Sequence, residues 1–173
     1  VIAALFGYRM ANQIVLELWS HEYGGSLGIA LADTFTSKVF FRDAFTMKYA
    51  KLYDGVRQDS GDPVTFREEL AIPHYKSMGI DPLSKILFHS DNLNVRKAID
   101  LTLGSVGKIK CSIGMGTHLT NDVGWDHLNM VIKATQVHWK GRSFHCVKLS
   151  DDPGKNSGDQ GEIVICKSSL GVE

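Results

Sequence analysis

The stretch GVRQDSGDP, residues 55–63, decides the fold, because it combines the end of an apolar strand, a polar loop and the start of a helix. Its final aspartate and proline are typical of a helix N-cap and first helical position, since the carboxylate accepts hydrogen bonds from free amides and proline fixes φ. In α/β folds, the loops that follow strands carry the ligand chemistry. Arg57, Asp59 and Ser60 are therefore predicted to face a binding site.

The composition is that of an ordinary globular protein. Its 173 residues are enough for one domain with a sizeable core, and 43% of them are hydrophobic and 22% charged. Nineteen basic residues balance nineteen acidic ones. This balance argues against a nucleic-acid or membrane-surface partner, because both favour a basic excess. Any anionic ligand must be held by a local cluster of donors.

Cys111, Cys146 and Cys166 are odd in number, widely spaced and without a CxxC pair. A disulfide framework or zinc site is therefore not predicted, and a reducing compartment, the cytoplasm, is the expected location. No apolar run approaches the ~20 residues that cross a bilayer. The sequence opens at Val1, without a methionine or signal peptide and inside an amphipathic pattern, so we expect an incomplete chain.

The chain alternates between amphipathic segments and short apolar runs. Apolar residues at helical spacing predict helices, and apolar runs bounded by turn residues predict buried strands. Pro73 should end or kink its helix, because it lacks the amide for the i−4 hydrogen bond. The predicted helices are residues 1–19, 36–52, 63–78 and 94–103, and the predicted strands are residues 27–31, the run ending at 57, 85–90 and 108–113.

This alternation predicts an α/β fold with a parallel sheet, open or closing into part of a barrel. A Lys140-Gly141 turn between two short strands predicts an antiparallel hairpin. We expect residues 1–125 to form the partial barrel and residues 126–150 to carry the hairpin. Residues 151–173 are rich in glycine, aspartate and serine, so a loop and a flexible tail are predicted there.

Polar and glycine residues follow each predicted parallel strand. Because the carboxyl ends of parallel strands meet at one edge of a sheet, these residues are predicted to form one site. The four strand ends are Asp33-Thr34, residues 57–60, residues 90–92 and residues 114–117.

The charged candidates each have a functional and a structural interpretation. Arg57 can bind a planar carboxylate through two parallel hydrogen bonds, or form a structural salt bridge with Asp59 or Asp62. Asp59 and Asp91 can accept hydrogen bonds from ribose hydroxyls or hold Mg²⁺ through water, or they can cap helices. Asp33 can orient a histidine or hold a metal, and a plain turn residue is the alternative.

The glycine-rich segment after the last strand suits a phosphate group. Gly114 and Gly116 let backbone amides approach closely, and the Thr117 hydroxyl adds a donor, although glycine pairs also make ordinary turns. His21-Glu22 has no second metal ligand at helical spacing, so no zinc site is predicted there.

Six segments, in this order, resemble the signature of the nicotinate phosphoribosyltransferase family. The resemblance runs from Val1 to about Asp159, and the order of the motifs makes it specific. The segments are LGIALADTF (27–35), GVRQDSGDP (55–63), SDNLN (90–94), SIGMGT (112–117), LNMVIK (128–133) and KLSDDPGK (148–155).

The resemblance implies an incomplete α/β barrel of the type II phosphoribosyltransferases, with a second domain built partly from the hairpin of residues 126–150 and a missing N-terminal part. The implied reaction joins nicotinate to phosphoribosyl pyrophosphate and gives nicotinate mononucleotide and pyrophosphate, a step of NAD salvage. The resemblance also implies Mg²⁺, a homodimer with shared sites, and ATP hydrolysis coupled through a phosphohistidine.

Residue roles are implied by the same resemblance. Arg57 would meet the nicotinate ring and carboxylate, while Asp59 and Asp91 would hold the ribose or the Mg²⁺-bound diphosphate. Ser60 would line the same site, and the 114–117 segment, through Gly114, Gly116 and Thr117, would cradle the 5′-phosphate. Asp33 would orient the phosphorylated histidine. Such positioning and charge stabilisation suit displacement at an anomeric carbon.

The chain departs from the family pattern where the phosphorylated histidine is concerned. That residue belongs to a His-Glu motif ahead of Val1, and His21-Glu22 lies elsewhere, so the role is not transferred. We therefore expect the isolated chain to be inactive. The alternatives are a nicotinamide or quinolinate relative, a non-catalytic phosphoribosyl-binding segment, and an unrelated phosphate-binding barrel enzyme. The 148–155 motif favours the nicotinate branch, and no lysine or glutamate base stands out at a strand end.

Overall fold

The computed structural model describes residues 1–121, 123–126, 128 and 130–172. Position 129 of the 128–133 motif and position 173 of the predicted tail lie outside the described residues, as do positions 122 and 127. The strands are β1 (Ile29–Leu31), β2 (Gly55–Gln58), β3 (Ile86–His89), β4 (Lys110–Ile113), β5 (Gln136–Trp139) and β6 (Arg142–His145). The helices are α1 (Ile2–Phe6), α2 (Tyr8–Tyr23), α3 (Ser37–Val39), α4 (Met47–Leu52), α5 (Pro63–Thr65), α6 (Ile72–Ser77), α7 (Val95–Ser105), α8 (Thr117–Thr120) and α9 (Gln160–Leu170), with the π-helical turns η1 (Phe40–Ala44) and η2 (Phe66–Ala71) and the 3₁₀ turn η3 (Pro82–Ser84).

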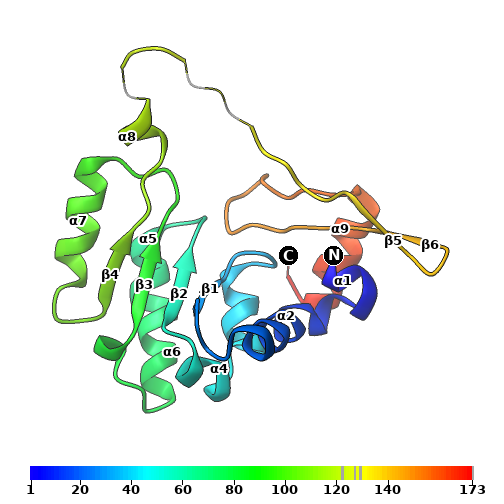
Figure 1. Cartoon of the computed structure of the whole chain (residues 1–173), viewed down its shortest axis with the longest axis horizontal. Coiled ribbons are helices and arrows are strands. Elements are labelled where there is room, and N and C mark those ends of the chain that lie inside the picture. The colour runs from blue at the N-terminus through cyan, green and yellow to red at the C-terminus, as the bar shows by residue number, and fades with distance from the viewer. Residues whose placement is uncertain (122, 127, 129, 173) are drawn as a thin grey trace.

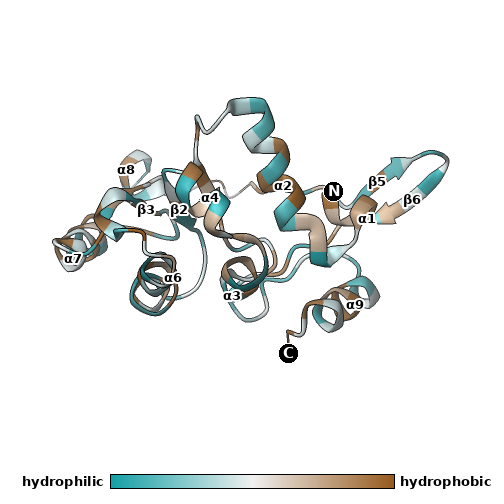
Figure 2. Ribbon diagram, turned by 90° about the horizontal axis from the view of Figure 1, so that it is seen from below, coloured by the Kyte–Doolittle hydropathy of each residue, from teal (hydrophilic) through white to brown (hydrophobic). Residues whose placement is uncertain are grey.

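Strands β1 to β4 form a parallel sheet in sequence order, and the helices that join them give the α/β arrangement that the sequence predicts (Figure 1). Viewed from below, α6 and α7 lie on the same face of the sheet (Figure 2). The antiparallel pair β5 and β6 is separate from this sheet. Its Lys140-Gly141 turn has positive φ at both positions, which matches the twist of a two-residue hairpin.

Alternation along β2 and β3 gives the sheet a buried and a more open face. Val56 and Leu87 are fully buried in the main hydrophobic core, which also contains aromatic residues of the joining helices, among them Phe40, Phe45 and Tyr75. Gln58 and His89, two residues further along the same strands, face the same side because side chains alternate with period two. Arg57 and Phe88 pair across the strands on the opposite face.

The helix after β2 begins as the sequence predicts. The Asp62 carboxylate caps α5 by accepting a hydrogen bond from the Thr65 amide at 2.6 Å, and this bond lowers the pKa of Asp62. Pro73 does not end the helix: it stands in the first turn of α6, directly after η2. The helical backbone runs through the π-helical turn before Pro73, where the Ile72 amide donates to the Arg67 carbonyl oxygen five residues back, so the i−4 pattern is already interrupted at this point.

The first predicted helix is divided. Gly7, with φ of 83°, separates α1 from α2, and the residues that α2 buries are Ala11 and Leu16. Val15 and Trp19, which follow Ala11 at helical spacing, are 45% and 40% exposed. They border an apolar groove of about 400 Å³ beside β1.

The prediction of a loop and flexible tail over residues 151–173 is wrong for residues 160–170. Residues 160–170 form α9, which packs on α2 and buries Ile163, Cys166 and Leu170 in a second core. Asp159 caps this helix by accepting from the Glu162 amide at 3.0 Å. The polar composition of the preceding loop concealed this helix, whose apolar residues complete a core that begins in α1 and α2.

None of the helices in the described part of the chain is long and apolar enough to cross a membrane.

Candidate functional site

The carboxyl edge of the sheet collects the residues that the sequence analysis selected. Arg57 is the last residue of β2 whose side chain lies on the more open face of the sheet, and Asp59 is the first residue after the strand. The guanidinium donates to Asp59 Oδ1 at 2.8 Å and to Ser90 Oγ at 2.8 Å, and Ser90 Oγ in turn donates to Asp59 Oδ1 at 2.6 Å. The loops after β2 and β3 are therefore joined by one charged, hydrogen-bonded cluster.

Of the two salt bridges predicted for Arg57, the one with Asp59 is present. Asp62 instead caps helix α5. The bonds use only one side of the guanidinium. In the described part of the chain, Arg57 Nη1 has no hydrogen-bond acceptor, and the side chain is 41% exposed. The guanidinium lies 6.0 Å from the centre of the Phe88 ring. Arg57 is thus held in place while its outer edge remains open to an anion.

Asp33 is almost fully buried two residues after β1. Its Oδ2 accepts hydrogen bonds from Ser60 Oγ at 2.8 Å and from Lys148 Nζ at 2.9 Å. Its Oδ1 is buried without a partner among the described residues. The structure therefore joins two predicted site residues, Asp33 and Ser60, through a direct bond.

The segment after the hairpin closes over this edge, and sequence reasoning missed it. Asp151 accepts from the Ser37 amide at 2.8 Å, and its own amide donates to Ser60 Oγ at 3.2 Å. Asp152 Oδ1 accepts from the Gly61 amide at 2.9 Å. Burial raises the pKa of Asp151, although its bonds with Ser37 lower it. The only signal in the sequence was the KLSDDPGK motif, whose residues were quoted for the resemblance but given no contacts.

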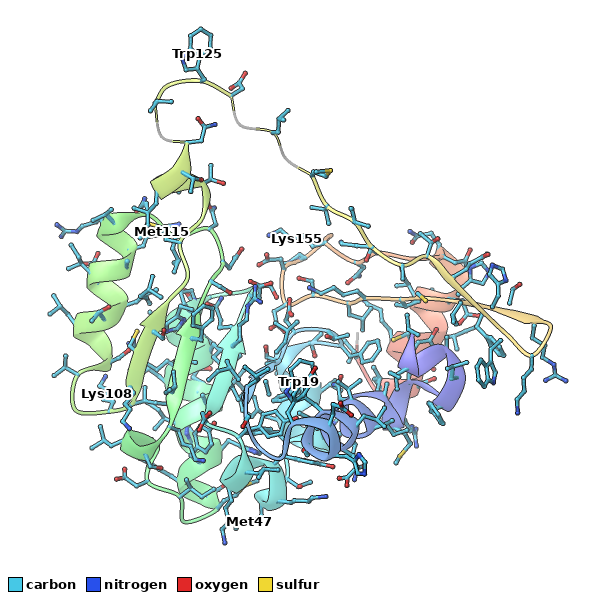
Figure 3. The ribbon with its side chains drawn as sticks, viewed as in Figure 1. Trp19, Met47, Lys108, Met115, Trp125 and Lys155 are labelled. Atoms are coloured by element: carbon cyan, nitrogen blue, oxygen red, sulfur yellow. The ribbon has the colours of Figure 1, made fainter. Side chains whose placement is uncertain are left out.

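Asp91 lies partly buried after β3, apart from the Arg57 cluster. Burial raises its pKa, and the carboxylates of Asp152 and Asp59 raise it further, while Lys155 and Lys97 lower it. In Figure 3, Lys155 and Met115 lie above the carboxyl edge of the sheet. A cation bound near Asp91 would therefore stabilise the ionised form of its carboxyl group.

The pair Asp59 and Asp91 is too small to form a metal cage. No group of three or more histidine, cysteine, aspartate or glutamate residues that could hold a metal occurs among the described residues. Mg²⁺ commonly uses one or two carboxylates together with substrate phosphates, and retains water. The two carboxylates therefore fit a magnesium ion that arrives with a diphosphate, and they do not form a complete site by themselves.

Glycines 114 and 116 differ in their surroundings. A Cβ at Gly114 would lie 2.8 Å from Phe88 Cζ and 3.3 Å from Ser90 Cβ, so this glycine is needed for close packing of β4 on β3. A Cβ at Gly116 would meet nothing within 4 Å. Thr117 is exposed at the start of the four-residue helix α8. Gly116 and Thr117 therefore border open space at the carboxyl edge of the sheet.

A hollow of about 390 Å³ lies beside this cluster. Gly61 and Asp62 line it from the loop after β2, Asp91 and Asn92 from the loop after β3, and Lys97 from α7. Of the candidate residues, Asp91 lines the hollow, while Arg57, Asp59 and residues 114–117 lie outside its lining. The carboxyl edge thus carries a held guanidinium, two carboxylates and an open glycine segment. This set suits a ligand that carries both a planar carboxylate and phosphate groups.

The chain is similar to proteins of one known family. A model of the nicotinate phosphoribosyltransferase (NAPRTase) family matches residues 2–171. A nicotinate phosphoribosyltransferase of Chromohalobacter salexigens is 47% identical over 170 residues, which are 98% of this chain and 43% of the relative. One of Methanosarcina mazei is 44% identical over 173 residues, 98% of this chain and 41% of the relative.

Solved structures agree with the sequence comparison. The crystal structure of nicotinate phosphoribosyltransferase from Porphyromonas gingivalis superposes with a TM-score of 0.93 at 41% identity, over 99% of this chain and 44% of that one. The chain thus spans less than half the length of the relatives it matches. Over that span, sequence and fold show that the chain belongs to the nicotinate phosphoribosyltransferase family.

Proposed function

We propose that the protein containing this chain joins nicotinate to phosphoribosyl pyrophosphate, forming nicotinate mononucleotide and pyrophosphate. The observation that carries the proposal is the guanidinium of Arg57. Asp59 and Ser90 hold it from one side, and its other edge is open at the carboxyl edge of the sheet. A held guanidinium pairs with a planar carboxylate such as that of nicotinate better than a mobile cation does. The named relatives support the same substrate.

The reaction needs positioning more than covalent help. The pyridine nitrogen of nicotinate attacks the anomeric carbon, a carbon–nitrogen bond forms, and the carbon–oxygen bond to the diphosphate breaks. The leaving diphosphate takes the bonding electron pair, and no proton moves in this step. Arg57 orients the ring through its carboxylate, and Asp59 and Asp91 border the path of the ribose. Holding the two reactants in this geometry lowers the entropic part of the activation free energy of the reaction.

Charge stabilisation comes from both ends of the site. Asp59 and Asp91 are the carboxylates that would hold Mg²⁺, which supplies positive charge to the leaving diphosphate. The amides of residues 114–117 and the Thr117 hydroxyl would bind the 5′-phosphate. The space around Gly116 supports this role, since a phosphate can approach its backbone without meeting a side chain.

Three further features belong to the proposal. ATP hydrolysis drives the reaction through a phosphohistidine, in line with ligase classification, and Asp33 orients that histidine. The unpartnered, buried Oδ1 of Asp33 supports this role, since it is an acceptor without a donor among the described residues. The enzyme is a cytoplasmic homodimer, and its free cysteines Cys111, Cys146 and Cys166 suit a reducing compartment.

The test is product formation by the full-length protein that contains this chain, with and without ATP, beside an Arg57→Ala variant. Nicotinate mononucleotide should form faster with ATP, and the variant should lose about 10²–10³-fold in kcat/KM, because the carboxylate loses a charge-assisted fork. Arg57→Lys is the matched control, since it keeps the charge but not the fork, and an intermediate loss is expected.

The outcomes separate the alternatives. Turnover of nicotinamide or quinolinate in place of nicotinate would show that the protein catalyses the same type of reaction on a different substrate. No turnover of any of the three by the full-length protein would overturn the proposal in favour of a non-catalytic binding segment. Equal activity with and without ATP would contradict the coupling to ATP hydrolysis and leave the rest of the proposal unchanged.

A further inference from the structure

The turn that carries Asp59 and Ser60 is held from beneath by a buried amide. Gln58, the last residue of β2, is 1% exposed and faces the helix side of the sheet. Its Nε2 donates to the carbonyl oxygen of Ser60 at 3.0 Å and to that of Gly61 at 3.1 Å. One side chain thus fixes two successive peptide groups of the turn.

The acceptors determine how the Gln58 amide is oriented. Carbonyl oxygens accept and cannot donate, so the group that faces Ser60 and Gly61 is the NH₂ group and not the oxygen. Gln58 Oε1 then points to the other neighbour, His89 Nδ1, at 3.0 Å. Because Oε1 can only accept, His89 must carry its proton on Nδ1.

The surroundings of His89 agree with this tautomer. The imidazole is fully buried, and its Nε2 has no partner among the described residues. A proton on Nε2 would have no acceptor among the described residues, whereas a proton on Nδ1 is donated to Gln58 Oε1.

We propose that Gln58 and His89 are positioning residues for the 59–61 turn, with His89 orienting the Gln58 amide and the amide fixing the turn. The inference rests on the proposed function, since it assigns the pair to the same site. Neither side chain reaches the open face of the sheet that carries Arg57.

The 59–61 turn carries two residues that make contacts in the site. Asp59 meets Arg57 and Ser90 on one side of the turn, and Ser60 meets Asp33 on the other. A peptide rotation at Ser60 or Gly61 would move both contacts together. A displacement of ~1 Å at a reacting site can cost about 10²-fold in rate, so loss of the Gln58 donors should lower kcat and leave substrate binding comparatively intact.

The variants separate the hydrogen bonds from the shape. In the full-length protein, Gln58→Met removes both donors at nearly constant volume, and kcat should fall about 10–100-fold with KM for nicotinate changed by less than about 3-fold. His89→Asn retains an N–H donor near the position of Nδ1, and its kcat should stay within about 3-fold of the unsubstituted protein. His89→Leu is its matched control, similar in size but without a donor, and should lose about 10-fold.

Unchanged kcat in Gln58→Met, or equal losses in His89→Asn and His89→Leu, would overturn the proposal, because the donors would then not matter. A second measurement does not depend on activity: the ¹⁵N NMR spectrum of His89 in the unsubstituted protein should show the Nδ1–H tautomer, and the Nε2–H tautomer would overturn the assignment. If the unsubstituted protein turns over no nicotinate, the proposed function fails, while the NMR result still decides the Gln58–His89 arrangement.

Discussion

The carboxyl ends of β1, β2 and β3 differ from the carboxyl end of β4 in how far their side chains are already bonded. At the first three, Asp33, Ser60 and Asp59 each bond to a residue from another loop. At the fourth, Gly116 and Thr117 are exposed, and α8 begins without a side-chain cap.

The difference separates two ways of building a binding site. The first region is preorganised: its polar atoms are oriented before any ligand arrives, so binding need not order them. The second offers backbone amides in open space, where a phosphate can bind without displacing side chains. Substitutions in the first region should therefore affect stability, and substitutions in the second should affect binding more than stability.

Asp33→Ala should produce the largest loss of stability. It removes the acceptor of Ser60 Oγ and leaves Lys148 without its buried partner. Breaking a buried pair costs about 3–5 kcal/mol, and the one-third exposure of Lys148 reduces this to about 2–3 kcal/mol. Thermal unfolding followed by circular dichroism should show a fall in Tm of roughly 5–10 °C.

Asp33→Asn is the control for that substitution, because it keeps one oxygen acceptor at the same place. It should lose less than half as much stability. An Asp33→Ala protein with unchanged Tm would mean that the first region is not held together by this carboxylate.

Gly61→Ala should rank second. Gly61 has φ of +74°, and a Cβ there would lie 2.9 Å from the Cβ of Asp151. The left-handed conformation costs a non-glycine residue about 1–2 kcal/mol, and the contact with Asp151 would push the covering segment away. Urea unfolding should show this loss of free energy, and a loss below about 0.5 kcal/mol would show that the 151–152 segment adjusts freely.

Much of the fold can be predicted from the sequence, since it depends on local patterns. The parallel strands, the Asp62 cap and the Lys140-Gly141 hairpin each follow from residues close together in the chain. Helix α9 was missed because its apolar face is recognisable only beside α2, which lies about 150 residues earlier. Tertiary packing decided the structure there, against a loop-like composition.

For the candidate site, the sequence predicts where the residues lie but not which residues they bond to. Parallel strands bring Arg57, Asp59 and Asp91 to one edge whatever the details, so their convergence follows from topology. The bonding partners do not follow from topology. Ser90 belongs to a strand end that the sequence places in the site, and Lys148 and Asp151 belong to a motif that the sequence analysis quotes. Their bonds to Arg57, Asp33 and Ser60 join distant loops, and the sequence carries no local sign of these pairs.

Gly116→Ala tests the open region and should cost less stability than Gly61→Ala. A Cβ there would meet nothing within 4 Å, but φ of −101° and ψ of −100° lie outside the α and β regions, so alanine carries a backbone cost of its own. If the amides of this segment bind the 5′-phosphate, the added methyl group should raise KM for phosphoribosyl pyrophosphate about 5–10-fold, with a smaller fall in Tm than in Gly61→Ala. A fall in Tm comparable to that of Gly61→Ala would remove the contrast between the two regions.

Asp91→Asn should have the smallest effect, and its sign depends on pH. Burial raises the folded-state pKa of Asp91 above the ordinary value of 3.8. Between these two values the folded chain binds more protons than the unfolded chain, so the free energy of unfolding falls as pH rises through this interval. The asparagine variant does not titrate and should be more stable than the unsubstituted protein above the interval, by less than about 1 kcal/mol.

Urea unfolding of both proteins at about pH 3 and about pH 7 measures this difference, and the comparison cancels the similar contribution of Asp151. Mg²⁺ with pyrophosphate sharpens the result. A cation held by Asp91 favours its ionised form, so the pair of ligands should stabilise the unsubstituted protein at neutral pH and should stabilise the variant less. Equal stabilisation of both proteins would exclude Asp91 from the magnesium site and leave Asp59 as its carboxylate.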